Sequence, residues 1–458
     1  MAPPRFGGEQ KWTRDMRNSA IARLGVMGVL TLALLVPLTM VLVTVSERSG
    51  RRDEAVRELS GTWGAPQTFG GPVLSVPYVQ QWVDANGKQQ RSWHRAHLLG
   101  TRLQIDGTVT PERRRRGIFE VIVYRAQLKV TGRFVRPTLE WLKVPADQIQ
   151  WDQASLSIGV ADPKGIATRG SLNWNGRTLA LTPDIADVGL FASGIQAAVP
   201  SLETIPAGTD IPFQLILDVN GTRELRFLPT AEETNVNLTS AWPHPSFAGA
   251  PLPQSRTTSD AGFTAHWLVT DLGRAYRQQW TSHGMDRDQL AARGEASAFG
   301  VILLQPVDIY QQAERAVKYA ILFIVLTFLV FFLWEVFQAT LLHPMQYAFV
   351  GFALCLFYLL LVSISEHTGF DTAYLVSSSA ATLLIGGYSR AVLKGTRQAA
   401  SVVGSLSGLY GFLYLLLRLE DYALLAGSIG MFLVLAFVMF ITRRMDWYNL
   451  RLGAARDA

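Results

Sequence analysis

The chain of 458 residues contains a single cysteine, Cys355, and this residue lies within a long apolar segment. One cysteine cannot form an intramolecular disulfide, so any domain outside the apolar segments must be held together by its own hydrophobic core. Charged residues are also scarce, at 17% of the chain. The sequence has neither a phosphate-binding P-loop nor the His-Glu-x-x-His pattern of zinc peptidases. These absences argue against an ATP-driven pump and against that class of metalloenzyme.

The formal net charge of +6 is modestly basic. A basic chain can bind nucleic acid, but here Lys and Arg are concentrated beside the apolar segments, as membrane topology requires. We therefore expect membrane lipids, and no nucleic acid, as partners.

Six apolar segments of about 20 residues stand out, and each is long enough to cross a hydrocarbon core of roughly 30 Å. The first comprises residues 24–45, and it is too long and lacks the small-x-small site of a cleaved signal peptide. We expect it to be a retained anchor. The other five are predicted at residues 319–337, 347–364, 373–393, 400–418 and 422–442.

Basic residues indicate the orientation of these spans, because cytoplasmic flanks carry an excess of Lys and Arg. They precede the first span at Arg5, Lys11, Arg14, Arg17 and Arg23, and follow the last at Arg443, Arg444, Arg451 and Arg456. Six crossings place both termini in the cytoplasm. The predicted organisation is a cytoplasmic tail (1–23), a transmembrane anchor (24–45), a domain outside the cytoplasm (46–317), a five-helix transmembrane bundle (318–442) and a second cytoplasmic tail (443–458).

The domain between the first and second spans has the pattern of a β-structure. After a charged segment that predicts a continuing helix at residues 47–60, short alternating or β-branched runs are separated by Gly, Pro, Asn and Asp. Regular short strands with turn signals favour an all-β, sandwich-like antiparallel fold. Tight turns are expected at Asn86-Gly87, Asp106-Gly107, Asn175-Gly176 and Asn220-Gly221. The run Arg113–Arg116 could contact an anion or lipopolysaccharide, but such a run is more typical of a solvated loop beside a strand.

The histidines of this domain give little support to catalysis. His94 and His97 are spaced i, i+3, which puts them on opposite faces of a strand. His244, His266 and His283 are dispersed, and no Gly-x-Ser-x-Gly nucleophile elbow is present. We expect no metal site and no cofactor.

One carboxylate, Glu335, lies near the end of the second span. A charge at such depth is costly and usually faces the interior of the bundle. It could act as a proton or ion relay or contact a partner; alternatively it could remain hydrated at the interface or lock the bundle through hydrogen bonds.

Small residues, at Ser377–Ala381, Gly386-Gly387 and Gly404-x-x-x-Gly408, predict close helix packing.

Several motifs in a fixed order make the chain resemble the CreD family of bacterial inner-membrane proteins, nearly end to end. They include Trp63-Gly64-x-x-Gln67, Trp242-Pro243-His244-Pro245-Ser246-Phe247, Gly262-Phe263-x-Ala265-His266-Trp267, Leu342-His343-Pro344-Met345-Gln346-Tyr347 and Ser365-Glu366-His367-Thr368-Gly369-Phe370. The resemblance implies a role in cell-envelope integrity and stress tolerance, a location in the inner membrane and a periplasmic position for the large domain. It implies no catalytic residues.

The family motifs supply candidate functional residues. Trp242, His244 and Phe247 lie in a rigid aromatic and proline segment. His343 lies in a short turn before a helix, and Glu366 and His367 lie in an outer loop that either docks the large domain onto the bundle or is an ordinary helix cap.

The leading hypothesis is a non-enzymatic protein that supports the envelope by binding a protein, lipid or glycan through its periplasmic domain. One alternative is a transporter or lipid conduit that uses Glu335, and another is a hydrolase acting on envelope polymers.

Overall fold

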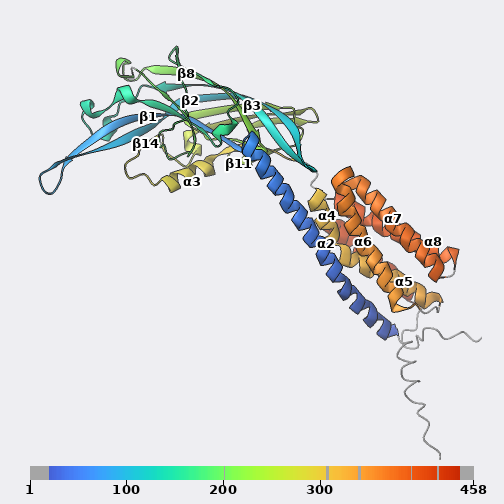
Figure 1. Cartoon of the computed structure of the whole chain (residues 1–458). Coiled ribbons are helices and arrows are strands. Elements are labelled where there is room, and N and C mark those ends of the chain that lie inside the picture. The colour runs from blue at the N-terminus through green and yellow to red at the C-terminus, as the bar shows by residue number, and fades with distance from the viewer. Residues whose placement is uncertain are drawn as a thin grey trace, which may run out of the picture. The chain divides into compact units, whose positions relative to one another are not determined.

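The computed structural model describes residues 20–200, 202–305, 309–338, 342–393, 395–419 and 422–443 (Figure 1). Arg5, Lys11, Arg14 and Arg17 of the expected N-terminal tail lie outside these residues, as do Arg444, Arg451 and Arg456 of the C-terminal tail. The chain divides into two compact units. One comprises Met1–Arg51 with Val307–Ala458, here called the helix bundle, and the other comprises Arg52–Pro306, here called the sheet domain.

Helix α2 (Ala20–Trp63) is 44 residues long, so the predicted helix that follows the anchor is confirmed. Its buried residues Leu34, Leu38, Val41 and Val45 recur every three or four positions and form one face against the bundle. Lipid-embedded helices tolerate an internal proline, and Pro37 lies within α2 without ending it.

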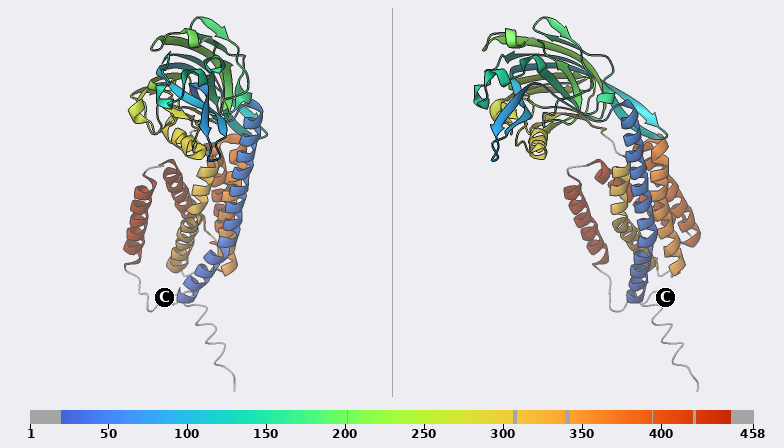
Figure 2. Two further views of the ribbon diagram at one scale, coloured as in Figure 1. Left: turned by 90° about the vertical axis from the view of Figure 1, so that its left-hand side faces the viewer. Right: turned by 60° about the vertical axis from the view of Figure 1, so that its left-hand side comes forward.

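The helix bundle continues after the sheet domain, and Figure 2 shows its helices beside one another. Its helices are α4 (Ile309–Lys318), α5 (Ala320–Gln338), α6 (Pro344–Thr368), α7 (Phe370–Val392), α8 (Thr396–Arg418) and α9 (Ala423–Thr442). Among the described residues, five helices are long and apolar enough to cross a membrane: α2, α5, α6, α8 and α9. The helix predicted at 373–393 is present as α7, but it is not among these five, because its serines and threonines lower its mean hydropathy. The predicted count of six spans is therefore not established.

The sheet domain consists mainly of strands. They are β1 (Gln67–Val83), β2 (Gln89–Arg116), β3 (Phe119–Val135), β4 (Ser155–Val160), β5 (Ser171–Trp174), β6 (Arg177–Leu179), β7 (Gly194–Ala198), β8 (Asp210–Thr222), β9 (Glu224–Phe227), β10 (Ala231–Ser240), β11 (Pro245–Gly249), β12 (Ser255–Ser259), β13 (Gly262–Thr270), β14 (Gln279–Thr281) and β15 (Phe299–Leu303). Its helices are α3 (Arg287–Ser297) and the short 3₁₀ helices Glu140–Leu142, Ala146–Gln148, Trp151–Gln153, Pro163–Gly165, Leu202–Thr204 and Asp271–Gly273.

The long strand β2 organises this domain, because its first half pairs with β1 and its second half pairs with β3. Most pairs are antiparallel, but β1 pairs with β9 and β2 with β10 in parallel. The expected purely antiparallel sandwich is thus corrected: the described residues of this domain form a mixed sheet, together with α3 and the end of α2. Turn residues in the sequence predict hairpins between consecutive strands. Parallel strands are joined by long connections, so no turn motif in the sequence predicts that they pair.

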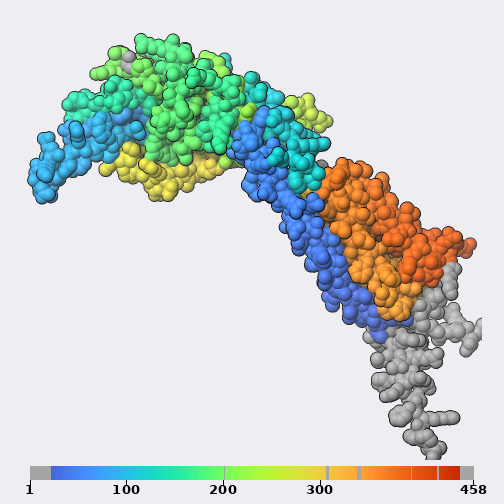
Figure 3. Space-filling model, in the orientation of Figure 1, coloured from blue at the N-terminus to red at the C-terminus, as the bar shows by residue number. Residues whose placement is uncertain are grey.

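Buried and exposed residues alternate along the strands, and the buried ones form the hydrophobic core. In β8, Phe213, Leu215 and Leu217 are buried, while the residues between them are exposed. Trp267 on β13 is fully buried in the same hydrophobic cluster. At the far tip of the β1–β2 hairpin, which extends from the rest of the sheet domain in Figure 3, Trp82 and Val83 are exposed.

Two of the four predicted turns are confirmed, and two are wrong. Asn86-Gly87 and Asn175-Gly176 join β1 to β2 and β5 to β6. Asp106-Gly107 lies within β2, and Asn220-Gly221 lies within β8. In the second case the glycine serves close approach instead of a turn, because a Cβ on Gly221 would lie 2.3 Å from the Tyr124 hydroxyl.

The arginine run lies at the end of β2 and not in a loop, which corrects the prediction for Arg113–Arg116. Arg114 forms an ion pair with Glu112 and stacks on Trp63, with its guanidinium carbon 3.6 Å from the ring centre. The next two arginines pair with Glu120 and Glu58. The positive charges of these three arginines are therefore paired with neighbouring carboxylates, and Arg114 also stacks on an aromatic ring.

Candidate functional sites

A cleft of about 570 Å³ lies in the sheet domain beside strand β14 and helix α3, both labelled in Figure 1. Aromatic side chains line it, from Trp141 on the first 3₁₀ helix, from Tyr276 and from Trp280 on β14. Its volume lies in the range typical of small-molecule sites, and it combines aromatic surface with several polar groups. The cleft is therefore the first candidate for a ligand site in this domain.

Buried hydrogen bonds hold the wall of the cleft. Arg274 is only 9% exposed, and its Nη1 donates to the carbonyls of Pro229 (3.3 Å) and Ala231 (2.9 Å). Gln278 accepts from Arg274 and donates to the carbonyls of Leu99 (3.0 Å) and Gly100 (2.8 Å). These paired hydrogen bonds of Arg274 and Gln278 preorganise this wall.

Trp280 is fixed from two sides. Its indole nitrogen donates to the carbonyl of Val188 at 3.0 Å, and its ring lies 5.5 Å from the imidazole of His97. His97 is fully buried, and its Nδ1 lies 2.9 Å from the Ser75 hydroxyl. Burial, with a smaller contribution from Arg95, lowers the pKa of His97 to about 3, so the imidazole is neutral at physiological pH.

The rim of the cleft carries unpaired positive charge. Arg277 and Arg293 are exposed, and neither side chain has an ion-pair partner among the described residues. Nearby Asp286 instead caps helix α3 by accepting from the backbone N–H of Gln289 at 3.0 Å, and Arg287 pairs with Asp187. The charged residues that line the cleft are thus two arginines and one aspartate, so the two guanidinium groups without an ion-pair partner can receive an anion.

The histidines do not assemble a metal centre. The rings of His94 and His283 lie 4.7 Å apart, and burial followed by the charge of His283 lowers the pKa of His94. His97 lies apart in the core. Within the described ranges, no group of three or more His, Cys, Asp or Glu is arranged to hold a metal ion.

The motif residues Trp242, His244 and Phe247 attach β11 to the rest of the domain. The indole nitrogen of Trp242 donates to the carbonyl of Leu304 at 2.9 Å. Phe247 packs against Phe263 and Trp267, with ring centres 5.7 Å and 5.8 Å away. The side chain of His244 is exposed. These contacts indicate packing as the main role of the segment, and they leave only His244 free to meet a partner.

Glu335 is fully buried in the helix bundle at the point where α2, α5 and α6 meet. Its carboxylate forms an ion pair with Arg23 of α2 and accepts from the N–H of Leu342 at 3.1 Å and from the Tyr347 hydroxyl at 2.9 Å. Three donors from three segments satisfy this charge. Such an arrangement favours a structural lock over a relay, which would need an open path for protons or ions.

A second carboxylate, Glu366, lies near the other end of α6. It accepts from the Tyr310 hydroxyl of α4 at 3.0 Å and lies 3.6 Å from Arg48 of α2. From residue 23 to residue 48, α2 rises about 37 Å at ~1.5 Å per residue, slightly more than the thickness of a hydrocarbon core. The two Arg–Glu pairs therefore fix α2 at both ends of its apolar segment.

The two remaining motif histidines lie at the ends of α6. His343 is its N-cap: the ring accepts from the N–H of Met345 at 3.2 Å, and Gln346 accepts from the N–H of His343 at 2.9 Å. This is a reciprocal capping box. His367 is exposed, and its Nδ1 lies 3.2 Å from the carbonyl of Ser363. The predicted docking of this turn onto the large domain stays a prediction.

Sequence reasoning missed the residues of the cleft. Trp141, Trp280, Arg277 and Arg293 come from separate segments and have no diagnostic spacing. The only local signal is the density of amides and aromatics from Tyr276 to Trp280, which does not distinguish a cleft from a strand.

In a comparison with known proteins, residues 19–448 match the family described as Inner membrane protein CreD. The chain is 34% identical over 426 residues to the protein of that name from Escherichia coli (strain K12), and the match covers 92% of each chain. Similarity to solved structures is weak. An M1 zinc metallopeptidase from Deinococcus radiodurans is 11% identical with a TM-score of 0.17, covering 37% of this chain and 38% of the peptidase. A mutant of that peptidase with a bound Tyr-Ser-Ala substrate is 13% identical with the same TM-score, covering 37% of this chain and 39% of its own. Neither likeness supports an argument about fold or activity.

Proposed function

Because the chain belongs to the CreD family of inner membrane proteins, we propose that it supports the bacterial envelope without catalysis, by binding an acidic envelope glycan in the cleft of its sheet domain. The bundle then serves as a membrane anchor for that contact. The sheet domain faces the periplasm in this proposal, because basic residues cluster before α2 and after α9.

The unpaired arginines on an aromatic cleft carry the proposal. Arg277 and Arg293 present guanidinium groups, which recognise carboxylates and phosphates through paired hydrogen bonds. Trp141 and Trp280 offer flat apolar surface, which suits the apolar face of a sugar ring. Gln289 adds an amide, which both donates and accepts hydrogen bonds as sugar hydroxyls require. An acidic glycan satisfies all three kinds of group together.

The experiment measures binding of purified cell-wall glycan fragments to the full-length protein in detergent, by calorimetry. Reversing both rim charges, with Arg277→Glu and Arg293→Glu together, should weaken binding at least tenfold, because two attractive contacts become repulsive. Arg177→Glu on β6 is the matched control, since it reverses an exposed arginine outside the cleft.

The same variants should be tested in a deletion strain under detergent, bile-salt and β-lactam challenge. We expect the double variant to fail to restore survival at a protein level equal to wild type, and the control to restore it. Equal glycan affinity of wild type and double variant would remove the cleft from the proposal. Full survival with the double variant would separate glycan binding from envelope support.

The rival hypothesis of transport through the bundle relies on Glu335. Its carboxylate is engaged by Arg23, Leu342 and Tyr347, and these contacts account for the residue without a transport role. The hydrolase rival needs a nucleophile, a base and a group that orients the base. Ser92 lies 2.6 Å from Nε2 of His94, and His283 lies beside it, but among the described residues no carboxylate forms a hydrogen bond with either histidine.

A further inference from the structure

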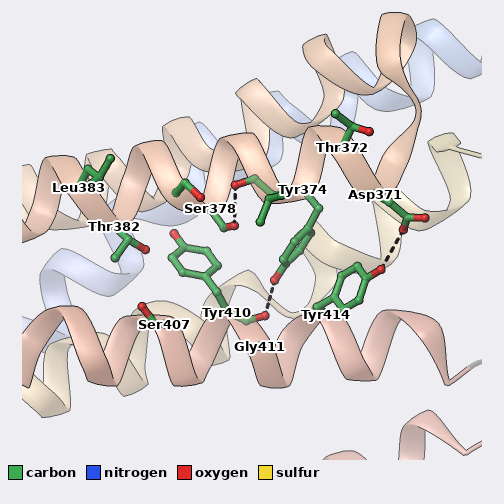
Figure 4. Close-up of a pocket in the computed structure, with 12 residues that line it drawn as sticks. Asp371, Thr372, Tyr374, Ser378, Thr382, Leu383, Ser407, Tyr410, Gly411 and Tyr414 are labelled. Atoms are coloured by element: carbon green, nitrogen blue, oxygen red, sulfur yellow. Dashed lines mark hydrogen bonds between the residues drawn. The ribbon is translucent and has the colours of Figure 1, made fainter.

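We propose that a groove between α7 and α8 holds one bilayer phospholipid with a zwitterionic headgroup. The groove has a volume of about 860 Å³, and Figure 4 shows its lining of tyrosine, serine and threonine side chains. The inference is independent of the glycan cleft, since it concerns the helix bundle alone. Three features of the groove match the parts of such a lipid.

The mouth of the groove carries one charge of each sign. Arg418, at the end of α8, donates from Nη2 to Asp371, in the first turn of α7, at 2.5 Å. The Tyr414 hydroxyl donates to Asp371 at 3.1 Å and accepts from Arg418 Nε at 3.1 Å. Both charged side chains are about half exposed, at 58% for Asp371 and 52% for Arg418. An ammonium can approach the carboxylate while a phosphate approaches the guanidinium, whereas an anionic headgroup would meet the repulsion of Asp371.

The middle of the groove holds an unpartnered donor. Tyr410 is only 3% exposed, and its hydroxyl has no hydrogen-bond partner among the described residues. In Figure 4 this hydroxyl points along the groove toward Ser378 and Thr382. Tyr374 differs, because its hydroxyl donates to the Tyr410 carbonyl at 2.7 Å. An unpaired hydroxyl at this depth costs free energy, and the ester oxygens of a phospholipid are acceptors located just below its headgroup.

The remainder of the groove is apolar and open. Leu375 and Leu383 line it from α7, and Gly411 forms part of its floor on α8. A Cβ added at Gly404, Gly408 or Gly411 would meet no atom within 4 Å. The close packing predicted for Gly404-x-x-x-Gly408 is therefore absent from the described chain, although Gly386 of α7 does meet Val403. The open space above Gly411, which lines the groove, fits an acyl chain.

A helix from a second copy fits the groove less well than a lipid. A phospholipid carries ester acceptors just below its headgroup, whereas an apolar helix would have to offer a main-chain carbonyl, as α8 does to Tyr374. An apolar helix would also have to cover the Asp371–Arg418 pair, at a cost in desolvation.

Native mass spectrometry of the full-length protein, released from mild detergent, tests the proposal. Wild type should retain one phospholipid, identified after extraction as phosphatidylethanolamine. Gly411→Leu should lose it, because the new side chain occupies the groove. Gly28→Leu on α2 adds the same side chain where a Cβ would also meet nothing within 4 Å, and it should retain the lipid. Tyr410→Phe should weaken retention about 3- to 10-fold, as expected for one lost hydrogen bond.

Competition with added phosphatidylethanolamine or phosphatidylglycerol tests the headgroup. Wild type should prefer the zwitterionic lipid, and Asp371→Asn should shift the preference toward the anionic one. The absence of bound phospholipid in wild type would overturn the proposal, as would equal retention by Gly411→Leu in a protein that elutes as a single species. An unchanged preference in Asp371→Asn would overturn the headgroup assignment.

Discussion

Two buried ionisable side chains, Glu335 and His97, show how a residue can be costly alone and stabilising in context. Glu335 is fully buried in the bundle, yet its carboxylate is paired with Arg23 and accepts from Tyr347. His97 is fully buried in the sheet domain, and its neutral imidazole meets Ser75 and Trp280. Glu335 keeps its charge because three donors surround it, whereas His97 loses its charge and retains one hydrogen bond, from Nδ1 to Ser75.

We predict that the Arg23–Glu335 pair acts as one stabilising unit. Glu335→Gln should destabilise the protein by about 3–5 kcal/mol, because it removes the carboxylate that pairs with the largely buried Arg23. Arg23→Gln should have a similar effect, and the double variant should be destabilised by less than the sum. Thermal unfolding of the four proteins in detergent measures this coupling. Additive effects would contradict the lock, and a folded, stable but inactive Glu335→Gln would restore the relay hypothesis.

His97 makes the sheet domain sensitive to acid. Its folded pKa of about 3 lies below the ordinary value of 6.5, so only the unfolded chain binds the proton in the interval between them. The stabilisation is fully present above pH 6.5 and is lost as the pH falls toward 3, by an amount on the order of a few kcal/mol. The urea midpoint at pH 4.5 should therefore lie well below that at pH 7.5.

A comparison of two histidine variants tests whether His97 causes this pH dependence of stability. His97→Gln should reduce the difference between the two midpoints, because the titrating group is gone. His244→Gln, which replaces an exposed histidine, should leave the difference as in wild type. The two pairs of midpoints, followed by tryptophan fluorescence of the full chain, decide between His97 and the other titrating groups.

At the scale of elements, the position of α2 on the bundle depends on close packing as well as charge. A Cβ on Gly351 of α6 would lie 2.2 Å from Cδ1 of Leu34 and 3.2 Å from Phe328. The glycine thus lets α2 approach α6 between the two Arg–Glu pairs. Small residues have this role in membrane bundles because apolar side chains gain little by leaving lipid.

We predict that Gly351→Leu destabilises the bundle by about 1–3 kcal/mol through overpacking. Gly28→Leu on α2 is the matched control and should change stability by less than about 0.5 kcal/mol, since its new side chain meets open space. Thermal unfolding in detergent compares them, and equal losses would show that the effect does not come from the α2–α6 contact.

At the scale of the whole molecule, the topology depends on whether α7 crosses the membrane. It is 23 residues long, but it is not among the five helices that are apolar enough by composition. Its Ser377 and Ser378 are buried within the bundle, so a polar composition need not prevent a span. The outcome decides on which side of the membrane the C-terminal residues lie.

We predict that α7 spans, so that its two ends lie on opposite sides. The chain has one cysteine, so Cys355→Ala gives a background for single-cysteine labelling. In intact spheroplasts, an impermeant maleimide should label Thr368→Cys before α7 and leave Arg397→Cys after it unlabelled until permeabilisation. Gly117→Cys, in the turn between β2 and β3, reports the side of the sheet domain. Labelling of both Thr368→Cys and Arg397→Cys in intact spheroplasts would reduce the count to five.

The sequence determined the features that depend on local composition. Apolar length identified the helices that are long enough to cross a membrane, and alternating and β-branched runs identified the domain between the first two of them as rich in strands. Helical propensity extended α2 beyond the apolar segment. These features follow from burial along one element, which a sequence pattern records directly.

Only the tertiary structure decided what depends on distant partners. It placed β10 parallel to β2, assigned Asn220-Gly221 to a strand, and brought Arg23 to Glu335. It also formed the cleft of Trp141 and Trp280 and left the Tyr410 hydroxyl without a partner in its groove. Pairing, charge satisfaction and cavity shape are properties of residues that meet only after folding, so no spacing along the chain encodes them.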